Sequence, residues 1–427
     1  MTPPGSPAMI GELRVLVDAR ITSGKVGGVE TVLTGLASGM SSLDGPERIT
    51  FLTWDDQKQW LEPYVSGHVT LVTQPRAATR AGVAARSRAA VAPFVPSFVR
   101  GWYRRRERDA WYSRSPGKDP FVENLRPQVI HIPIQNGFLT DVPSIYHPHD
   151  LQHRHLPEFF SAEEVAWRDR WYETLCRHST VVAVSSAWTR ADVIEQLNLR
   201  SGKVHVVPLA PPIAAGPLPD PRQQSALLAE LGVAEPYALY PAQFWAHKNH
   251  IRLLQAIAQL RTAGLEVNLV GTGFQTEHFA VVDATARKLG IADLVQWPGF
   301  VPQASLRALF GNARAVIVPS LFESASGPLW EAFDAGVPAA CSNVTSLPDQ
   351  AGDAAVVFDP LSISSIADAL SSIWTDDALR DRLRIAGKRR IASLSWPKTA
   401  SIFRAHYRKL ARATLSDEDR SLLSENE

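Results

Sequence analysis

Short apolar runs alternate with segments of helical periodicity along most of the chain. Residues 12–20 form an apolar run that ends in a loop, and residues 27–40 then place apolar side chains at helical spacing. The same order recurs in the second half, where the runs 237–242, 267–271 and 315–320 each precede a helical segment. This alternation predicts an α/β fold built on parallel sheets.

A proline-rich stretch without either period divides this alternation into two halves. We interpret residues 208–222 as a stiff linker between a first domain, 1–207, and a second domain, 223–395. A closing helix is expected at 396–412 and a disordered acidic tail at 413–427. The 427 residues suit two domains. The predicted fold is therefore two doubly wound Rossmann-like domains that face each other across a cleft.

Composition narrows the class of protein only slightly. The chain is 45% hydrophobic and 20% charged, and its 44 Lys and Arg nearly balance 43 Asp and Glu. This is typical of a soluble globular protein and argues neither for nor against a nucleic-acid partner. Cys176 and Cys341 lie far apart without a CxxC pair, so neither a disulfide framework nor a zinc site is expected. The chain shows no signal-peptide pattern and no apolar run of about 18 residues, so we expect a cytosolic protein.

The glycines do not form a dinucleotide fingerprint or a P-loop. The first loop carries Gly24, Gly27 and Gly28 instead of GxGxxG, and the pair Gly271 and Gly273 lacks the third glycine. Gly28, at the start of a helix, could still allow close approach of a ligand phosphate. A simple tight turn explains it equally well.

Two glutamates flank a predicted helix start after the run 315–320. Pro328 suits the first helical turn and Ser326 suits the cap, so Glu323 lies in the loop and Glu331 lies about one turn inside the helix. At the carboxyl edge of a parallel sheet both could face one ligand. The alternative is that Glu323 caps the helix and Glu331 interacts with its dipole.

Four segments resemble one enzyme family. FESASGPLWEAFDAGVP is similar to the E-x7-E signature of retaining GT-B glycosyltransferases of family 4, the glycosyl transferases group 1. YPAQFWAHKNHIRLLQA, YHPHDLQHRHLPEFF and LSWPKTASIF resemble the lysine, histidine and closing-helix segments of that family. The resemblance runs from about Leu13 to Leu410 and is strongest in the second half.

The resemblance implies roles for individual residues. Glu323 would be the carboxylate beside the donor sugar, Glu331 would hold the nucleotide ribose, Lys248 would neutralise the diphosphate, and His149 would contact the sugar. The remaining donor-binding positions would be Gln243, Ser324, Ala325, Ser326, Gly327 and Gly28. Because Lys248 and helix N–H groups can face the leaving diphosphate, no metal and no cofactor besides the donor are expected.

Two departures from the family pattern leave the donor open. Gln243 stands where many members have an arginine, and an amide can bind a phosphate oxygen without neutralising it. Ser324 and Ser326 stand where glycines are common. His147, His149, His153 and His155 also crowd together, but their spacing fits no standard zinc pattern.

A basic and aromatic segment occupies residues 76–118. It holds eleven Lys and Arg against two acidic residues, interleaved with Trp, Tyr, Phe and Val. Such a composition favours the anionic surface of a membrane, although a solvated insertion is the alternative. No fold signal for nucleic-acid binding accompanies it.

The preferred function is retaining transfer of a hexose from a nucleotide-diphosphate sugar, with GDP-mannose as a candidate. The acceptor would be a glycan or a lipid-linked glycan in cell-surface polysaccharide synthesis. A nucleotide-sugar epimerase and a non-catalytic nucleotide-sugar-binding protein are the alternatives.

Overall fold

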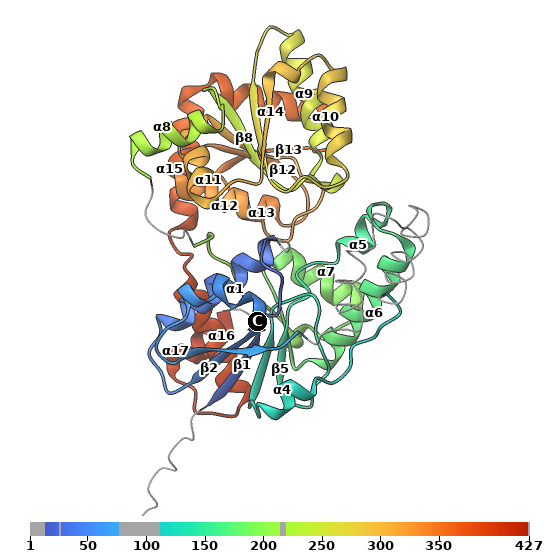
Figure 1. The fold of residues 1–427 in the computed structure, drawn as a ribbon, viewed down its shortest axis with the longest axis vertical. Coiled ribbons are helices and arrows are strands. Elements are labelled where there is room, and N and C mark those ends of the chain that lie inside the picture. The colour runs from blue at the N-terminus through green and yellow to red at the C-terminus, as the bar shows by residue number, and fades with distance from the viewer. Residues whose placement is uncertain (1–12, 25–26, 77–111, 214–218, 426–427) are drawn as a thin grey trace, which may run out of the picture. The chain divides into compact units, whose positions relative to one another are not determined.

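The computed structural model describes residues 13–24, 27–76, 112–213 and 219–425. The chain divides into two compact units (Figure 1). Unit 1 comprises Met1–Val184, Arg190–Val207 and Trp396–Glu427, and unit 2 comprises Ser185–Thr189 and Pro208–Ser395. Of the segment 76–118, residues 77–111 lie outside the described part of the chain.

Unit 1 is built on a parallel sheet of seven strands in the order β3-β2-β1-β4-β5-β6-β7. The strands are β1 Arg14–Asp18, β2 Arg48–Trp54, β3 Val69–Gln74, β4 Val129–Ile132, β5 Ser144–Tyr146, β6 Val181–Val184 and β7 Val204–Val206. The α-helices among its described residues are α1 Gly28–Ser41, α4 Pro120–Asn124, α5 Gln152–His155, α6 Ala162–His178, most of α7 Ala187–Leu197, α16 Trp396–Leu410 and α17 Asp417–Glu425. Since β1 lies beside both β2 and β4, the winding reverses at β1, as in doubly wound folds.

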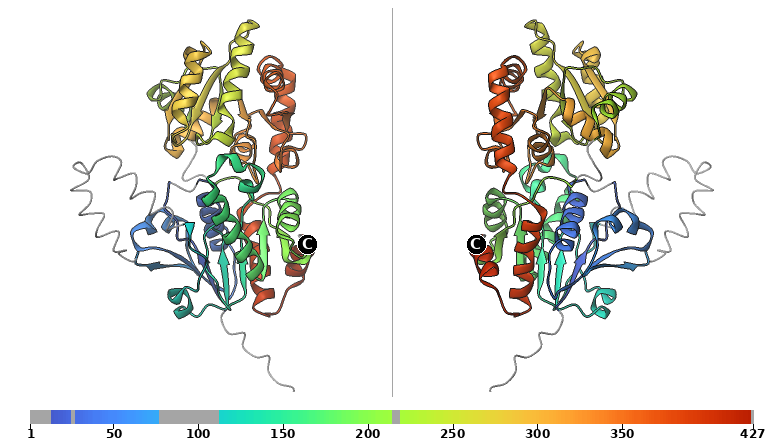
Figure 2. Two further views of the ribbon diagram at one scale, coloured as in Figure 1. Left: turned by 90° about the vertical axis from the view of Figure 1, so that its right-hand side faces the viewer. Right: turned by 90° about the vertical axis from the view of Figure 1, so that its left-hand side faces the viewer.

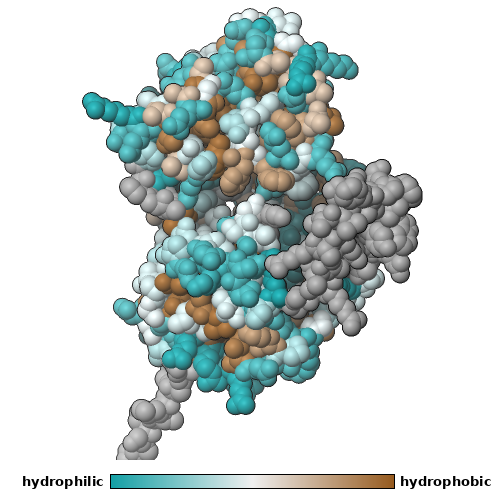
Figure 3. All heavy atoms as spheres, viewed as in Figure 1, coloured by the Kyte–Doolittle hydropathy of each residue, from teal (hydrophilic) through white to brown (hydrophobic). Residues whose placement is uncertain are grey.

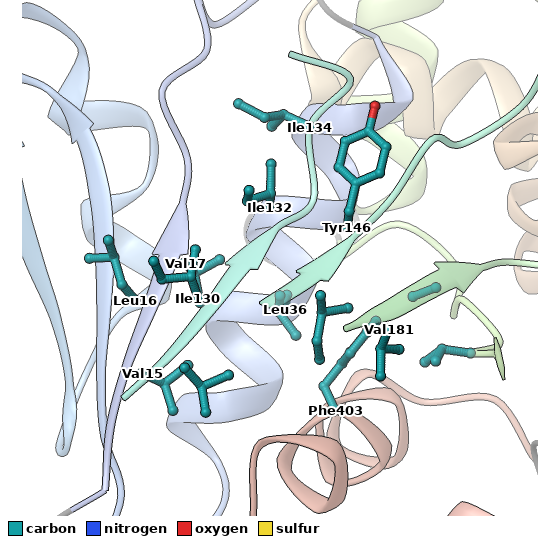
Figure 4. Close-up of a cluster of buried hydrophobic side chains, with 14 of the residues drawn as sticks. Val15, Leu16, Val17, Leu36, Ile130, Ile132, Ile134, Tyr146, Val181 and Phe403 are labelled. Atoms are coloured by element: carbon teal, nitrogen blue, oxygen red, sulfur yellow. The ribbon is translucent and has the colours of Figure 1, made fainter. Parts of the chain in front are cut away.

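The core of unit 1 joins strands and helices from distant parts of the chain. Val15 and Ile130 lie on adjacent central strands, and each is at most 2% exposed. Figure 4 shows Leu36 of α1 and Phe403 of α16 in the same cluster. The apolar runs seen in the sequence are therefore strands buried on both faces, as parallel sheets require.

Helix α16 packs directly against α1 (Figure 2), so the closing helix belongs to unit 1. Gly35 and Gly39 make this possible. A Cβ on Gly35 would lie 2.1 Å from the Trp396 ring, and one on Gly39 would lie 2.4 Å from the Trp396 carbonyl oxygen. The two glycines of α1 thus form the seat for Trp396.

The acidic tail is not disordered as expected, because residues 417–425 form α17. Ser416 Oγ accepts from the backbone N–H of Asp419, and Asp419 Oδ2 accepts from the N–H of Ser416. Arg408 of α16 binds Asp419 at 3.0 Å and Glu47 at 2.6 Å. The capping box and the buried ion pairs with Arg408 therefore stabilise α17 despite the acidic composition of the tail.

Unit 2 is built on a parallel sheet of six strands in the order β10-β9-β8-β11-β12-β13. The strands are β8 Tyr237–Pro241, β9 Asn268–Thr272, β10 Val295–Gly299, β11 Ala315–Val318, β12 Ala339–Ser342 and β13 Ala355–Phe358. The α-helices are α8 Pro221–Glu230, α9 His250–Thr262, α10 Phe279–Lys288, α11 Gln303–Asn312, α12 Gly327–Ala335, α13 Leu347–Ala351, α14 Ile363–Thr375 and α15 Asp377–Ile391. Two parallel Rossmann-like sheets confirm the predicted fold class.

Alternate side chains of the unit 2 strands enter two separate cores. Ala238 and Tyr240 join a cluster with α9, α10 and α14, whereas Tyr237 and Leu239 join one with α8, α11 and α12. Helix α8 begins at Pro221, earlier than the expected end of the linker, because Asp220 and Gln223 form a capping box there.

Both cysteines are buried free thiols, Cys176 in unit 1 and Cys341 in unit 2. Across the described ranges, no helix combines the length and apolar character that crossing a membrane requires. On the face drawn in Figure 3, hydrophilic and hydrophobic residues are interspersed over both units.

Candidate active site

The candidate donor site lies where the winding of unit 2 reverses. Strand β8 pairs with both β9 and β11, so the loops after β8 and β11 leave the carboxyl edge side by side. Ligands of doubly wound sheets bind at such a switch point. The first loop carries Lys248 and the second carries Glu323.

Lys248 is held by its neighbours on both loops. Asn249 adopts a left-handed conformation, with φ of 61°, and its side-chain amide donates to the carbonyl oxygens of Pro319 at 3.0 Å and Pro360 at 2.9 Å. Tyr240 Oη donates to the Lys248 carbonyl oxygen at 2.9 Å. The buried amide of Asn249 thus fixes the backbone from which the lysine extends.

Lys248 and Glu323 form an ion pair, with 2.5 Å between Nζ and Oε1. Ser320 Oγ donates to the same carboxylate oxygen at 2.6 Å. Thr345 Oγ1 accepts from the Glu323 backbone N–H at 3.1 Å and donates to its carbonyl oxygen at 2.6 Å. The structure therefore brings together the two residues to which the sequence assigns the diphosphate and the sugar.

The start of α12 follows Glu323 directly. Ser326 is 1% exposed, and its Oγ caps the helix by accepting from the Leu329 N–H. The Gln350 side chain accepts from the Ser326 N–H at 2.8 Å and donates to its carbonyl oxygen at 2.7 Å. In the described chain, the N–H groups of Ala325 and Gly327 have no protein partner, so this helix end can receive an anion.

Glu331 lies in the second turn of α12 and is half-buried. Burial and then the charge of Asp334 raise the pKa of its carboxyl group from 4.5 to about 7. No hydrogen bond of the described residues occupies this carboxylate. Glu331 can therefore gain stabilisation from hydroxyl donors of a ligand.

Gln243 lies in the loop after β8, beside the β9 loop. The Trp245 indole N–H donates to Gln243 Oε1 at 2.6 Å, so the amide presents its NH₂ group as a donor. Gly273, with φ of 150°, leaves room for this loop, because a Cβ there would lie 2.5 Å from the Ala242 carbonyl oxygen.

The sequence profile described as Glycosyl transferases group 1 matches residues 229–390, which include Lys248, Glu323 and Glu331. Residues 229–390 of this chain therefore carry the domain that defines the glycosyl transferases group 1. Its second unit carries the match.

Two relatives of this chain have mannosyltransferase names. The chain is 26% identical over 251 residues to the O-antigen chain mannosyltransferase B of Escherichia coli. This alignment covers 58% of this chain and 65% of the relative. It is 26% identical over 251 residues to the MMP alpha-(1->4)-mannosyltransferase of Mycolicibacterium hassiacum. This alignment covers 56% of this chain and 58% of the relative. The matched stretch thus spans less than two thirds of either relative.

Among solved structures, Anabaena Alr3699/HepE in complex with UDP and glucose superposes with a TM-score of 0.66. The match covers 93% of this chain and 100% of that one at 17% identity. This likeness supports the fold alone.

The remaining residues that the family resemblance selected, Gly28 and His149, belong to unit 1. Gly28 is the first residue of α1 and is exposed, with nothing within 4 Å of a Cβ position. Glu30 fastens the preceding loop by accepting from Ser23 Oγ and the Gly24 N–H, each at 2.7 Å. The open space at Gly28 is compatible with close approach of a ligand. It is equally compatible with a glycine that serves only a tight turn.

The four crowded histidines do not converge on one point. His147 Nε2 lies 2.8 Å from His131 Nε2, and His149 Nε2 donates to the Pro133 carbonyl oxygen at 2.9 Å. His153 pairs with Asp169 and His155 with Asp192. In the part of the chain that the structure describes, no three His, Cys, Asp or Glu are grouped to hold a metal ion.

The sequence does not single out the residues that orient Lys248, Glu323 and Ser326. Tyr240 lies in β8, Ser320 and Thr345 lie in the loops after β11 and β12, and Gln350 lies in α13, so no local pattern links them. Only Asn249 carried a signal, because asparagine tolerates the left-handed conformation before a helix.

Proposed function

We propose that this protein is a retaining glycosyltransferase that moves a hexose from a nucleotide-diphosphate sugar to a glycan or lipid-linked acceptor. The observation that carries the proposal is the Lys248–Glu323 pair beside the open N–H groups of α12, within the stretch that matches the family. Cleavage of the donor bond leaves negative charge on a diphosphate and positive charge on the sugar. A cation and an anion side by side suit these two developing charges.

In the proposed reaction the diphosphate binds at the start of α12. Lys248 exchanges part of its contact with Glu323 for the phosphate oxygens, and the N–H groups of Ala325 and Gly327 add further donors. Gln243 donates its NH₂ group to a phosphate oxygen without adding charge. Glu323 then stabilises the sugar as it becomes oxocarbenium-like.

The proposed donor is GDP-mannose. Support comes from the mannosyltransferase names of both relatives, whereas the neighbour of known structure carries UDP and glucose. Glu331 is proposed to accept hydrogen bonds from the ribose hydroxyls, which all nucleoside diphosphates share. The first unit, with His149, is proposed to contact sugar hydroxyls.

A thermal-shift panel of nucleoside diphosphates and nucleotide sugars tests the proposal. A ligand at one hundred times its dissociation constant stabilises the protein by about 2.7 kcal/mol, so the preferred base and sugar give the largest shift. Release of the nucleoside diphosphate without an acceptor, together with an α-anomeric product from an α-linked donor, supports a retaining transferase. Interconversion of two nucleotide sugars indicates an epimerase instead, and binding without turnover indicates the non-catalytic protein.

We further propose that the segment 76–118 binds an anionic membrane surface, on the basis of its eleven basic residues and interleaved aromatic side chains. Substitution of Arg104, Arg105 and Arg106 by Ser should weaken liposome binding by about 3 kcal/mol if each contributes about 1. Sedimentation that is insensitive to salt and to these substitutions supports the solvated insertion.

A further inference from the structure

Three buried side chains of unit 1 form a continuous hydrogen-bonded row. Tyr407 Oη of α16 lies 2.6 Å from His131 Nδ1 on β4, and His131 Nε2 lies 2.8 Å from His147 Nε2, directly after β5. Tyr407 and His131 are 0% exposed and His147 is 6% exposed. The Phe403 ring stacks against His147, with 5.2 Å between ring centroids, so the row is packed as well as bonded.

The direction of this row follows from the number of available hydrogens. Burial lowers the pKa of His131 to about 3, so its ring is neutral and carries one hydrogen. Among the described residues, the Tyr407 hydroxyl has no other partner, so donation to His131 Nδ1 leaves nothing unsatisfied. His131 then carries its hydrogen on Nε2 and donates to His147 Nε2, which places the hydrogen of His147 on Nδ1.

His149 has the opposite arrangement. Its Nε2 faces the Pro133 carbonyl oxygen at 2.9 Å, and a carbonyl only accepts, so Nε2 carries the hydrogen and Nδ1 carries a lone pair. The His149 backbone has φ of 65°, a left-handed conformation that the surrounding structure must hold. The rings of His147 and His149 lie 5.7 Å apart between centroids.

We propose that Tyr407 and His131 are positioning residues, which hold His147 in the tautomer opposite to that of His149, so that the two histidines offer one donor and one acceptor to a sugar hydroxyl. In the described chain neither Nδ1 has a hydrogen-bond partner. A hydroxyl both donates and accepts, whereas an ionised phosphate oxygen only accepts, so this pair selects an alcohol. This inference rests on the proposed glycosyl transfer and deepens it by assigning the chemistry of the sugar contact.

Helix α16 gives the arrangement its physical basis. The helix reaches the sheet because Trp396 sits on Gly35 and Gly39 of α1, and the same helix presents Phe403 and Tyr407 to the histidines. A tyrosine hydroxyl in this place supplies a hydrogen without charge, which a buried site tolerates better than a cation.

Nitrogen-15 NMR of the histidine rings in the whole protein tests the tautomers directly. We expect the hydrogen on Nε2 in His131, on Nδ1 in His147 and on Nε2 in His149. Tyr407→Phe removes the hydroxyl and should move the His131 hydrogen to Nδ1 or mix the two tautomers of His147. The measurement on the unsubstituted protein remains decisive if Tyr407→Phe does not fold.

Kinetics separate positioning from a structural role. Tyr407→Phe should lower kcat about tenfold, the scale of one misplaced hydrogen bond, with little change in affinity for the bare nucleoside diphosphate. Tyr237→Phe is the matched control, because its hydroxyl is also buried and bonded, at 2.7 Å to the Leu309 carbonyl oxygen, away from the row. Equal effects of the two substitutions, or reversed tautomers, overturn the inference. Correct tautomers in a protein without turnover overturn the proposed function and leave the row itself standing.

Discussion

The half-buried carboxyl group of Glu331 should make the protein less stable at high pH than its glutamine variant. The pKa of Glu331 is raised from 4.5 to about 7, so between these values the folded state binds more protons than the unfolded state. By linkage, stability then falls as the pH rises through this window, and the full penalty is present above pH 7. At about 1.4 kcal/mol per pKa unit, the shift corresponds to about 3 kcal/mol.

Glu331→Gln keeps the shape of the side chain and removes the charge. We expect the substitution to raise the Tm of unit 2 by roughly 6–12 °C at pH 8, since about 1 kcal/mol corresponds to 2–4 °C in a domain of this size. At about pH 3.5, where both states bind the proton in most molecules, the two proteins should unfold at nearly the same temperature. Calorimetry at both pH values measures the difference.

Asp368→Asn is a suitable control, because Asp368 is an exposed carboxylate in the middle of α14. As a surface substitution away from the sheet, it should change the Tm little. A Glu331→Gln variant that is no more stable than the parent at pH 8 would refute the reasoning, since an uncompensated buried charge must cost free energy.

Ligand binding gives the same residue a second test. If Glu331 accepts hydrogen bonds from a ribose, nucleoside diphosphate binding favours its ionised form and releases a proton near pH 7. Titration calorimetry in two buffers of different ionisation enthalpy detects that proton. Its absence in the parent, or its persistence in Glu331→Gln, contradicts the assignment to the ribose.

Three further predictions concern other parts of the chain. Lys248→Ala should lower turnover by about two orders of magnitude or more with an unchanged circular dichroism spectrum, as for loss of one preorganised charge, and near-normal turnover would reject its role. Gly35→Ala should destabilise unit 1 by about 1–3 kcal/mol through overpacking against Trp396, and in a Trp396→Ala background it should cost far less. Burial lowers the pKa of His131 and of His406 to about 3, so their neutral rings contribute stability that is complete above pH 6.5 and lost as the pH falls towards 3. Urea unfolding should show little change from pH 7.5 to about 6.5 and, below that, a loss that approaches about 1.4 kcal/mol per pH unit for each group; a flat profile down to pH 5 would contradict it.

The order of strands and helices follows from local patterns, and the sequence predicts it well. The runs 237–242 and 315–320 are apolar on both faces, and the helices after them show helical periodicity. Site residues that belong to a short sequence motif can be identified from the sequence for the same reason, because the motif is local. Glu323 and Glu331 keep their spacing wherever the chain folds, and Ser326 caps the helix as its position suggests.

Where local signals compete, the sequence misleads. The tail 413–427 has the composition of a disordered segment, yet Ser416 and Asp419 carry a capping box. Arg408, from another helix, supplies the charge that makes α17 stable. Composition is an average over the whole segment, whereas a capping box depends on two particular residues that are three positions apart.

Only the tertiary structure pairs Lys248 with Glu323 across 75 residues, because the order of strands decides which loops share a sheet edge. It also separates the histidines of residues 147–155, although they are neighbours in the chain, since each ring finds a different partner. The place of Tyr407 beside His131, 276 residues away, depends on a helix that returns to the first unit and packs on two glycines. The sequence by itself determined the elements and the reactive side chains, because these depend on nearest neighbours, and packing decided which side chains meet and which ring nitrogen carries the hydrogen.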